Sequence, residues 1–208
     1  MGIKILFFLL FAAAIIFLQN SCCSDPQAGL LSEGTYRIPY ANGTKVKVTR
    51  DHCTHSPKNR IDMRGTGGQG PYRVVAAQSG VIRFISDGNS ANCCDGSCAN
   101  NYVWIQHSNG EWTKYSHLTT GSVTGDAGLS VGDQVSIGAF LGYEGDVGRA
   151  CGVHLHFEVA VPNDPNNPLN SGNGGFINGV NRVPVICGIG SVAFERNHIY
   201  TAANCLLN

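Results

Sequence analysis

Charged side chains are scarce in this sequence. Lys, Arg, Asp and Glu together make up 13% of the 208 residues, and 14 basic side chains balance 14 acidic ones. Proteins that bind nucleic acid through its phosphates usually show a clear excess of Lys and Arg, so the composition does not support nucleic acid as a partner. Hydrophobic residues make up 43% of the chain, which argues against a largely disordered protein.

Helical periodicity is also missing. Beyond the first 18 residues, no stretch repeats hydrophobic side chains at the 3.6-residue spacing of an amphipathic helix. Short runs of β-branched and aromatic residues alternate instead with turns, for which the chain has 27 glycines. We therefore predict an all-β protein whose main domain, residues 36–162, folds as a compact antiparallel sandwich or barrel-like sheet.

Long apolar runs are absent except at the N-terminus, where Lys4 precedes an apolar run over residues 5–18. A membrane-spanning helix needs about 20 such residues, so we interpret residues 1–22 as an export signal. A small residue followed by Cys22 at its end resembles a bacterial lipoprotein signal, which predicts a lipid anchor at Cys22. Plain secretion is the alternative, and in both cases residues 23–35 would form a polar tether.

Nine cysteines suit an exported protein, because disulfides persist in oxidising compartments. Without Cys22 and Cys23, seven remain, and this odd number predicts one that is free or paired unexpectedly. Cys93, Cys94 and Cys98 lie close together but lack the partner Cys-X-X-Cys of a zinc knuckle. We interpret them as part of a disulfide-tied loop.

Residues 163–208 form a separate tail in this interpretation. Its first part is rich in Asn, Gly and Pro and is expected to be irregular. Two strand-like runs follow, 183–187 and 198–201, and we expect them to pair as a terminal hairpin. A Cys187–Cys205 disulfide would close this hairpin and contribute roughly 3 kcal/mol to stability.

Two further hairpins are predicted nearer the N-terminus. The Asn-Gly pair at 42–43 is a strong turn signal between extended runs. Residues 102–107 and 111–117 flank a second turn and are expected to pair. This second hairpin would bring His107 and His117 into one antiparallel ribbon.

The stretch 152–159 has the alternation of a half-buried strand. His154, His156 and Glu158 share one face, and the residues between them are apolar and should cover a core. Two imidazoles on such a face lie roughly 6.5–7 Å apart, which is too far for a hydrogen bond. That distance suits one imidazole bound to a metal and the other facing a substrate on the metal.

A second histidine-rich segment could supply further ligands. His52 and His55 precede Pro57, which disfavours a helix there, and Asp62 follows in a short apolar context. A loop histidine and a strand aspartate would provide one nitrogen and one oxygen ligand. Catalytic zinc sites commonly use three protein ligands and keep a further position for water. Either histidine could fill the nitrogen role.

Four segments, in this order, resemble the lysostaphin/LytM-type zinc metallopeptidases, which cut peptide cross-bridges in bacterial cell walls. They are a lead strand with its turn, a central hairpin, the segment before the histidine strand, and the His-Leu-His-Phe-Glu motif: residues 74–82, 102–118, 131–142 and 154–158. The resemblance covers roughly half of the chain. It implies the family's barrel-like β-sandwich with an open groove.

The resemblance also implies roles for individual residues. The implied zinc ligands and catalytic histidines are, respectively, His55, Asp62 and His156, and His117 and His154. His107 would lie outside the metal shell. The family's common first motif is shorter than the six residues that separate His55 from Asp62, so the choice between His52 and His55 stays open.

The implied function is that of a zinc-dependent endopeptidase that hydrolyses peptide cross-links or stem peptides of bacterial peptidoglycan. The protein would act as a monomer, exported to the cell envelope and held at the membrane only through a lipid anchor at Cys22. An alternative is a non-catalytic module of the same fold that binds the wall or regulates an amidase. A third possibility, a structural disulfide-rich surface domain, predicts no bound metal.

Overall fold

The computed structural model describes residues 30–172, 174–189 and 193–205. The predicted signal over residues 1–22, with Cys22, and the first part of the predicted tether lie outside these ranges. Within the described residues, no helix combines the length and apolar character that crossing a bilayer requires.

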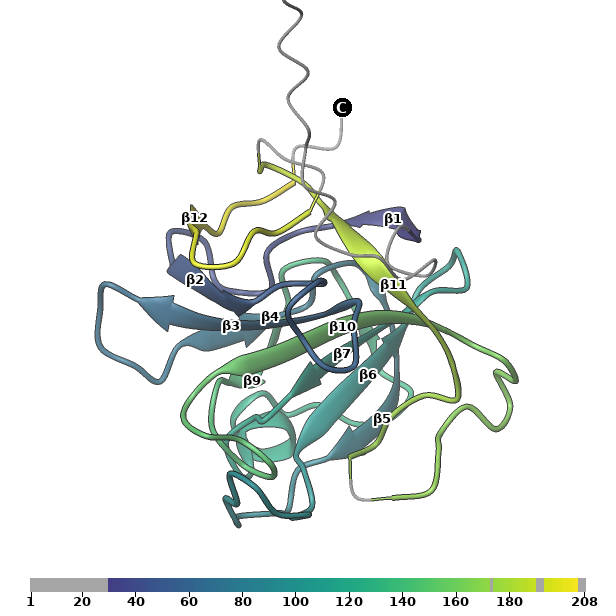
Figure 1. The fold of residues 1–208 in the computed structure, drawn as a ribbon. Helices are drawn as coiled ribbons and strands as arrows, with labels where there is room; N and C mark the ends of the chain where they lie inside the picture. The colour runs from purple at the N-terminus through teal and green to yellow at the C-terminus, as the bar shows by residue number, and fades with distance from the viewer. Residues whose placement is uncertain (1–29, 173, 190–192, 206–208) are drawn as a thin grey trace, which may run out of the picture.

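The regular secondary structure of the described chain is almost entirely β, which confirms the all-β prediction (Figure 1). The strands in chain order are β1 (Leu31–Tyr36), β2 (Lys45–Arg50), β3 (Arg60–Thr66), β4 (Arg73–Val75), β5 (Gly80–Ser86), β6 (Tyr102–Gln106), β7 (Trp112–Ser116), β8 (Gln134–Val135), β9 (Phe140–Tyr143), β10 (Leu155–Pro162), β11 (Gly179–Ile186) and β12 (Ile199–Thr201). A short π-helical turn, η2 (Ser122–Asp126), lies between β7 and β8.

One large sheet carries most of the molecule. Its path is β12-β2-β3-β10-β7-β6-β5-β8, and β11 joins it by pairing with β10 and β1, while β4 and β9 form a separate small sheet. All described strand pairs are antiparallel except β1 with β11. Figure 1 shows β10 crossing the middle of the molecule between β3 and β7. The predicted hairpin over residues 102–117 is present as β6 and β7.

Strand β10 has one face in the hydrophobic core. Leu155, Phe157 and Val159 are fully buried, and Phe157 packs against Tyr115 with ring centroids 5.5 Å apart. Burying side chains of this size contributes about 1.5–3 kcal/mol each, and a slip of one residue would turn all three outward. Core packing therefore fixes the register of β10, and the register decides what its opposite face meets.

The hairpin predicted around residues 42–43 does not form, although the turn does. Gly43 has a φ of 83°, and the Thr44 N–H donates to the Ala41 carbonyl at 3.1 Å. Before the turn, Tyr40 makes an isolated bridge with Val74, and after it β2 pairs with β3 and β12. An Asn-Gly pair specifies the local turn, but the strands beyond it choose partners through long-range packing.

The predicted terminal hairpin is also replaced by other pairings. Strand β11 pairs with β10 and β1, and β12 pairs with β2. An isolated two-stranded hairpin is marginal in water, whereas the edges of the large sheet offer each run a ready partner. The parallel pairing with β11 also places residues 31–35, expected as the end of the tether, in strand β1.

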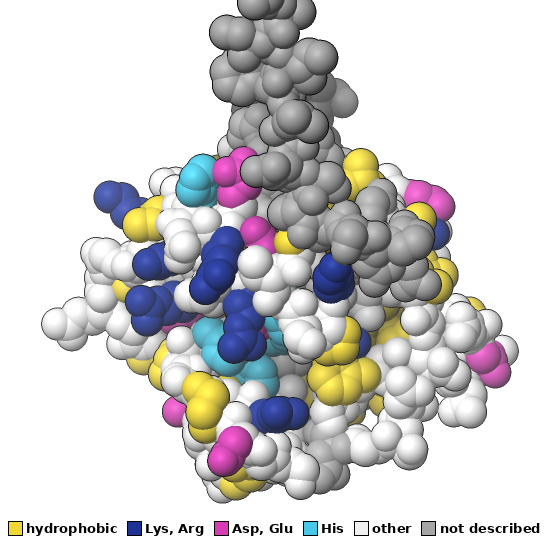
Figure 2. All heavy atoms as spheres, in the orientation of Figure 1, with side chains coloured by type: hydrophobic (Ala, Val, Ile, Leu, Met, Phe, Trp, Pro, Cys, Tyr) yellow, Lys and Arg dark blue, Asp and Glu magenta, His cyan; other side chains and the backbone are white. Residues whose placement is uncertain are grey.

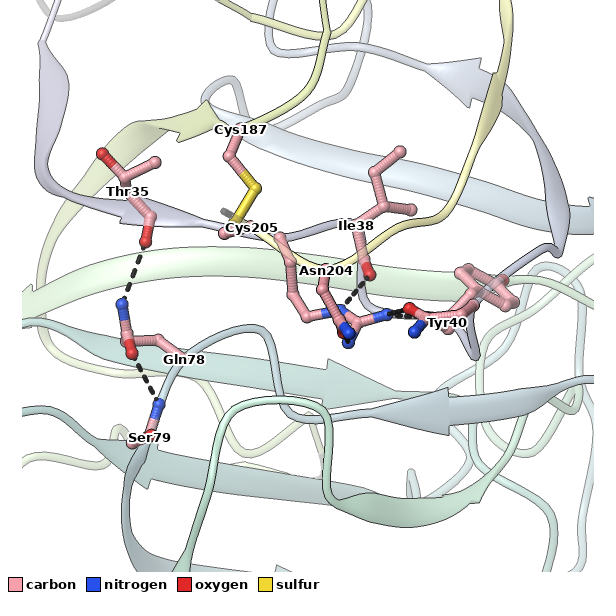
Figure 3. Close-up of a disulfide and its surroundings, with 10 residues drawn as sticks. Thr35, Ile38, Tyr40, Gln78, Ser79, Cys187, Asn204 and Cys205 are labelled. Carbon is pink, nitrogen blue, oxygen red and sulfur yellow. Dashed lines mark hydrogen bonds between the residues drawn. A yellow bond between two sulfur atoms is a disulfide. The ribbon is translucent and has the colours of Figure 1, made fainter. Parts of the chain in front are cut away.

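The expected Cys187–Cys205 disulfide is present (Figure 3). Beside it, the Arg37 guanidinium donates to Asn204 Oδ1 at 2.7 Å, and Gln78 Nε2 donates to the Thr35 carbonyl at 3.1 Å. The Arg37–Asn204 bond ties the end of the described chain to the segment after β1, and the Gln78–Thr35 bond ties β1 to the turn before β5.

The loop around residues 93–98 is tied by disulfides, as predicted. Cys93 pairs with Cys98, and Cys94 pairs with Cys151, which lies 57 residues further along the chain. Cys53 is disulfide-bonded as well, and none of the described cysteines is free. The Cys94–Cys151 bond fastens this loop to the segment just before the histidine strand.

Candidate active site

Strand register brings the candidate site together. His156 on β10 lies directly opposite Asp62 on β3 and Ser116 on β7. Opposite residues in antiparallel strands point to the same face of the sheet, so the Asp62 carboxylate meets the His156 ring. The chain leaves β7 one residue before His117, which places a further imidazole at the same end of β10.

Three side chains form what we call the inner group: His55, Asp62 and His156. Asp62 Oδ1 lies 3.3 Å from His55 Nε2 and 3.1 Å from His156 Nδ1. One ligand atom from each residue lies within 4.8 Å of the others, and the side chains are 6–8% exposed. This is a compact set of two imidazole nitrogens and one carboxylate oxygen.

The donor chemistry of the inner group fits a cation. His55 Nδ1 must donate to the Pro57 carbonyl, 2.7 Å away, so the neutral ring carries its lone pair on Nε2. That lone pair faces a carboxylate oxygen, which is also an acceptor. Two acceptors in contact need a proton or a metal ion between them, and two imidazoles with one carboxylate are a usual zinc donor set.

Local structure selects His55 over His52 for this position. The Asp51 carboxylate accepts the backbone N–H of Cys53 at 3.1 Å and of Thr54 at 2.9 Å, and the His55 N–H donates to the Asp51 carbonyl at 2.9 Å. The resulting turn directs the His55 ring to Asp62. His52 lies instead in a group with Asp51 and the disulfide-bonded Cys53.

His117 and His154 form a second set, which we call the outer pair. Their ring centroids are 4.6 Å apart. Their Nδ1–H groups donate to the carbonyls of Val147 and Gly152, each at 2.8 Å. Both neutral rings therefore carry the lone pair on Nε2, and the Nε2 atom of His154 lies 3.8 Å from Asp62 Oδ1.

His117 has a strained backbone. Its φ is 66°, in the left-handed region that a residue with a Cβ rarely adopts and that costs about 1–3 kcal/mol. The surroundings hold it there, because the His117 N–H donates to the Asn101 carbonyl at 3.0 Å and to Asn100 Oδ1 at 3.1 Å. Such strain is typical of residues whose position matters for function.

Electrostatics separates the two sets. Burial, and then repulsion from His154 and His156, lowers the pKa of His117 to about 3, and burial lowers the pKa of His154. Burial by itself would raise the pKa of Asp62 and lower that of His156. The hydrogen bond between the two side chains outweighs burial, so that the pKa of Asp62 is lowered and that of His156 is raised. At neutral pH, the outer pair is neutral and the inner carboxylate is ionised.

Behind His156 lies a buried ionic network. His156 Nε2 is 3.5 Å from Glu158 Oε1, while Glu158 Oε2 accepts from Arg60 Nε at 2.8 Å and Asn181 Nδ2 at 2.6 Å. Lys114 Nζ is 3.4 Å from Glu158 Oε1, and burial lowers the pKa of this lysine to about 8 despite that carboxylate. A carboxylate behind a ligating imidazole fixes its tautomer and orientation.

Glu158 is a residue whose role the sequence did not reveal. The two-residue spacing after His154 and His156 places it on the histidine face, but its partners come from three other strands. His107, in contrast, lies away from both sets, as the resemblance implied. It contacts the Ser79 carbonyl at 2.9 Å and the Thr113 hydroxyl at 2.9 Å.

Both sets open into a groove with a volume of about 1230 Å³, in agreement with the predicted open groove. The disulfide of Cys94 and Cys151 lies in its wall, and Phe176 lines it as well. Figure 2 shows the histidine side chains gathered near the middle of this face, with Lys and Arg side chains around them.

A family model described as peptidase family M23 matches residues 56–168. This range includes Asp62, both histidines of the outer pair, and His156, and it begins one residue after His55. The peptidoglycan DD-endopeptidase ShyA of Vibrio cholerae serotype O1 is 40% identical over 73 residues, which cover 35% of this chain and 16% of ShyA. The chain spans 16% to 22% of the length of the first curated relatives that it matches.

The solved structures to which the chain is similar include pseudoalterin, described as an M23 metalloprotease from the deep sea. It is 20% identical, with a TM-score of 0.48, over 83% of this chain and 98% of that chain. Lysostaphin from Staphylococcus simulans is 22% identical, with a TM-score of 0.42, over 62% of this chain and 48% of that chain.

Proposed function

The chain belongs to peptidase family M23, and from this premise we propose that it is a zinc-dependent endopeptidase that hydrolyses peptide cross-links or stem peptides of bacterial peptidoglycan. The observation that carries the proposal is the single carboxylate of Asp62, which His55 and His156 share while a neutral histidine pair stands beside it. The relative ShyA, named a peptidoglycan DD-endopeptidase, supports the substrate class.

His55 Nε2, the Asp62 carboxylate and His156 Nδ1 would hold the zinc ion. When bound, zinc lowers the pKa of water towards neutrality and polarises a carbonyl oxygen. The chain's part is to hold the three donor atoms close together and in orientation. The backbone carbonyl of Pro57 fixes the tautomer of His55 through a hydrogen bond. The Glu158 carboxylate, 3.5 Å from His156 Nε2, favours the tautomer of His156 that carries its proton on that nitrogen.

The outer pair would move the protons. The neutral Nε2 of one ring accepts a proton from the attacking water as its oxygen bonds to the scissile carbonyl carbon. The resulting imidazolium passes this proton to the leaving amine when the C–N bond breaks, and the second ring hydrogen-bonds at the reacting centre. Their Nδ1–H bonds to Val147 and Gly152 hold both rings in orientation, and the low pKa of His117 keeps its Nε2 free at neutral pH.

Nothing in this scheme needs a nucleophilic side chain. A Gly-X-Ser-X-Gly sequence does occur at residues 128–132, of the kind found at the nucleophile of serine hydrolases. In the described structure, it lies in the turn before β8, and the Ser130 N–H donates to Asp133 Oδ2 at 2.8 Å. These residues do not line the groove.

We place the protein in the cell envelope, where this substrate lies. The predicted signal would export it, and the predicted lipid at Cys22 would hold it at the membrane as a monomer. The non-catalytic module of the same fold remains the rival interpretation. The complete donor set and the strained, neutral His117 favour the enzyme, because a pure binding module requires neither.

A digestion experiment tests the proposal. Purified peptidoglycan is incubated with the zinc-loaded protein, with and without a chelator, and new amine termini are identified by mass spectrometry. We expect termini at one type of peptide bond, lost with chelator and restored by added zinc. A zinc-loaded protein that binds the wall but releases no new amine would instead support the binding module.

A further inference from the structure

The rim of the groove concentrates positive charge in a chain whose formal net charge is zero. Apart from histidines, the charged side chains that line the groove are Arg50, Arg60, Asp62, Arg64 and Arg149. Figure 2 shows Lys and Arg side chains on several sides of the histidines on this face. The groove thus presents several guanidinium groups against a single carboxylate, and bound zinc would add further positive charge.

Three of these arginines are available to a ligand. Arg60 is buried and committed to Glu158 at 2.8 Å. Arg50 is held only loosely, with Nη1 3.6 Å from Asp62 Oδ2 and a side chain that is 60% exposed. Among the described residues, the exposed guanidinium groups of Arg64 and Arg149 take part in no hydrogen bond or ion pair.

The three available arginines come from separate parts of the groove wall. Arg50 ends β2, and Arg64 lies on β3 two residues after Asp62, on the same strand face because side chains alternate. Arg149 lies in the loop before β10, five residues ahead of His154. A peptide bound across the histidines would therefore pass basic side chains from both the strands and the loop.

We propose that Arg50, Arg64 and Arg149 are specificity-determining residues that bind free carboxylates of the substrate peptide. This inference rests on the proposed function and narrows its substrate class to peptides with carboxylates near the scissile bond, in preference to neutral bridges such as oligoglycine. A guanidinium pairs with a carboxylate through charge-assisted, often bidentate hydrogen bonds. A neutral peptide or an amidated carboxyl group offers these arginines only uncharged carbonyl oxygens.

The test compares two forms of one substrate. A soluble cross-linked muropeptide is used with its carboxyl groups free or chemically amidated. The proteins are the zinc-loaded wild type, Arg64→Gln, Arg149→Gln, Arg50→Gln and the triple variant. Arg83→Gln is the matched control, because Arg83 is an exposed arginine that does not line the groove. Zinc content is measured for each protein, since Arg50 contacts Asp62.

We expect the wild type to prefer the free-carboxylate form, and added salt to weaken that preference. Each groove substitution should raise KM for this form about two- to fivefold with kcat nearly unchanged, which is the pattern of lost substrate binding. The triple variant should treat both forms alike, and Arg83→Gln should match the wild type. Equal KM for both forms in the wild type, or a preference that survives in the triple variant, would overturn the inference.

A binding measurement separates this inference from the proposed function. Fluorescence anisotropy of the labelled muropeptides is recorded with zinc-loaded His117→Ala protein, in which turnover is suppressed. Arginine-dependent binding of the free-carboxylate form supports the inference even if no variant hydrolyses it, in which case only the proposed activity fails. The carboxylate inference is wrong if neither muropeptide form binds. It is also wrong if inorganic polyphosphate binds in an arginine-dependent way while the free-carboxylate muropeptide does not.

Discussion

The inner group and the outer pair use the same side chain in different surroundings. His55 and His156 each turn a ring nitrogen to the Asp62 carboxylate, at 3.3 and 3.1 Å. His117 and His154 instead donate Nδ1–H to backbone carbonyls, and the Nε2 atom of His154 stays farther from Asp62 Oδ1, at 3.8 Å. The partner of the ring, rather than the residue type, separates the proposed metal ligands from the proposed proton carriers.

The same contrast appears in the pKa values. Contact with carboxylates on both ring nitrogens raises the pKa of His156. Burial without such contact, together with two imidazole neighbours, lowers the pKa of His117 to about 3. The carboxylates of Asp62 and Glu158 thus give His156 a pKa shift opposite to that of His117.

The largest effect should come from removing the negative charge of Asp62, which both inner histidines face. Asp62→Asn keeps the shape of the side chain but withdraws the negative oxygen that both inner histidines face. We expect bound zinc to fall from about one per protein to nearly none and hydrolysis of peptidoglycan to become undetectable. Elemental analysis and a wall-digestion assay check this, with circular dichroism as the control for folding. Retention of zinc would show that Asp62 is not a ligand.

Removing a member of the outer pair should leave the inner group intact. His117→Ala deletes a neutral Nε2 without touching Asp62, so zinc content should stay close to that of the wild type. The rate should fall roughly 10²–10⁴-fold, the range for loss of a general acid–base group. A smaller loss would mean that His117 only shapes the site. His107→Ala, outside both sets, separates a general loss of packing from this effect.

Removing the charge of Glu158, which lies behind the inner group, should have an intermediate effect. Glu158→Gln keeps the volume but removes the charge that faces His156 Nε2, and changes in such supporting partners typically reduce metal affinity about 10- to 100-fold. Competition with a chelator measures the zinc affinity, and the rate at saturating zinc should recover towards the wild-type value. Since Arg60 and Lys114 then lack their carboxylate, the free energy of unfolding should be measured in parallel.

Acidification should affect the two sets differently. Because its hydrogen bonds to carboxylates raise the pKa of His156, its protonated form competes with zinc at a higher pH than an ordinary imidazole would, while Asp62, with its lowered pKa, stays ionised. Zinc affinity should therefore be flat above the raised pKa of His156 and fall by up to about tenfold per pH unit below it. Chelator competition between pH 8 and pH 5 checks this. An affinity that does not depend on pH would contradict the assignment of His156.

The smallest effect on the site should come from the tail. Replacing Cys187 and Cys205 together by Ser opens a link between residues 18 positions apart and should lower the free energy of unfolding by roughly 3 kcal/mol. Zinc content and rate at low temperature should not change, because the described groove is lined by neither cysteine. Urea denaturation beside the digestion assay distinguishes stability from function. A change in zinc content would mean that the tail supports the inner group.

Local patterns in the sequence were sufficient to predict much of this fold. The alternation over residues 152–159 predicted a strand that the structure places three residues later, as β10 (Leu155–Pro162), with His154 in an isolated bridge just before it. It also predicted the face that His156 shares with Glu158, and the runs around the turn at 108–110 predicted β6 and β7. These features depend on neighbours close in the chain. The proximity of Asp62 to the histidines was implied only by the family resemblance, since strand partners 94 residues apart leave no local signal.

What the sequence did not predict depends on partners distant in the chain. The Asn-Gly turn at 42–43 formed, but its flanking segments paired elsewhere, and β11 and β12 joined the large sheet instead of each other. The choice between His52 and His55 depended on a turn that Asp51 closes. The role of Glu158 depended on buried cations supplied by other strands.

The most direct test of the division of labour compares the two histidines of one short stretch, His154 and His156. Zinc per protein is measured for the two alanine variants beside the rate on purified peptidoglycan. We predict that His156→Ala loses both zinc and activity, while His154→Ala keeps about one zinc per protein and loses roughly 10²–10⁴-fold in rate. The opposite result, zinc lost from His154→Ala and retained by His156→Ala, would contradict the account.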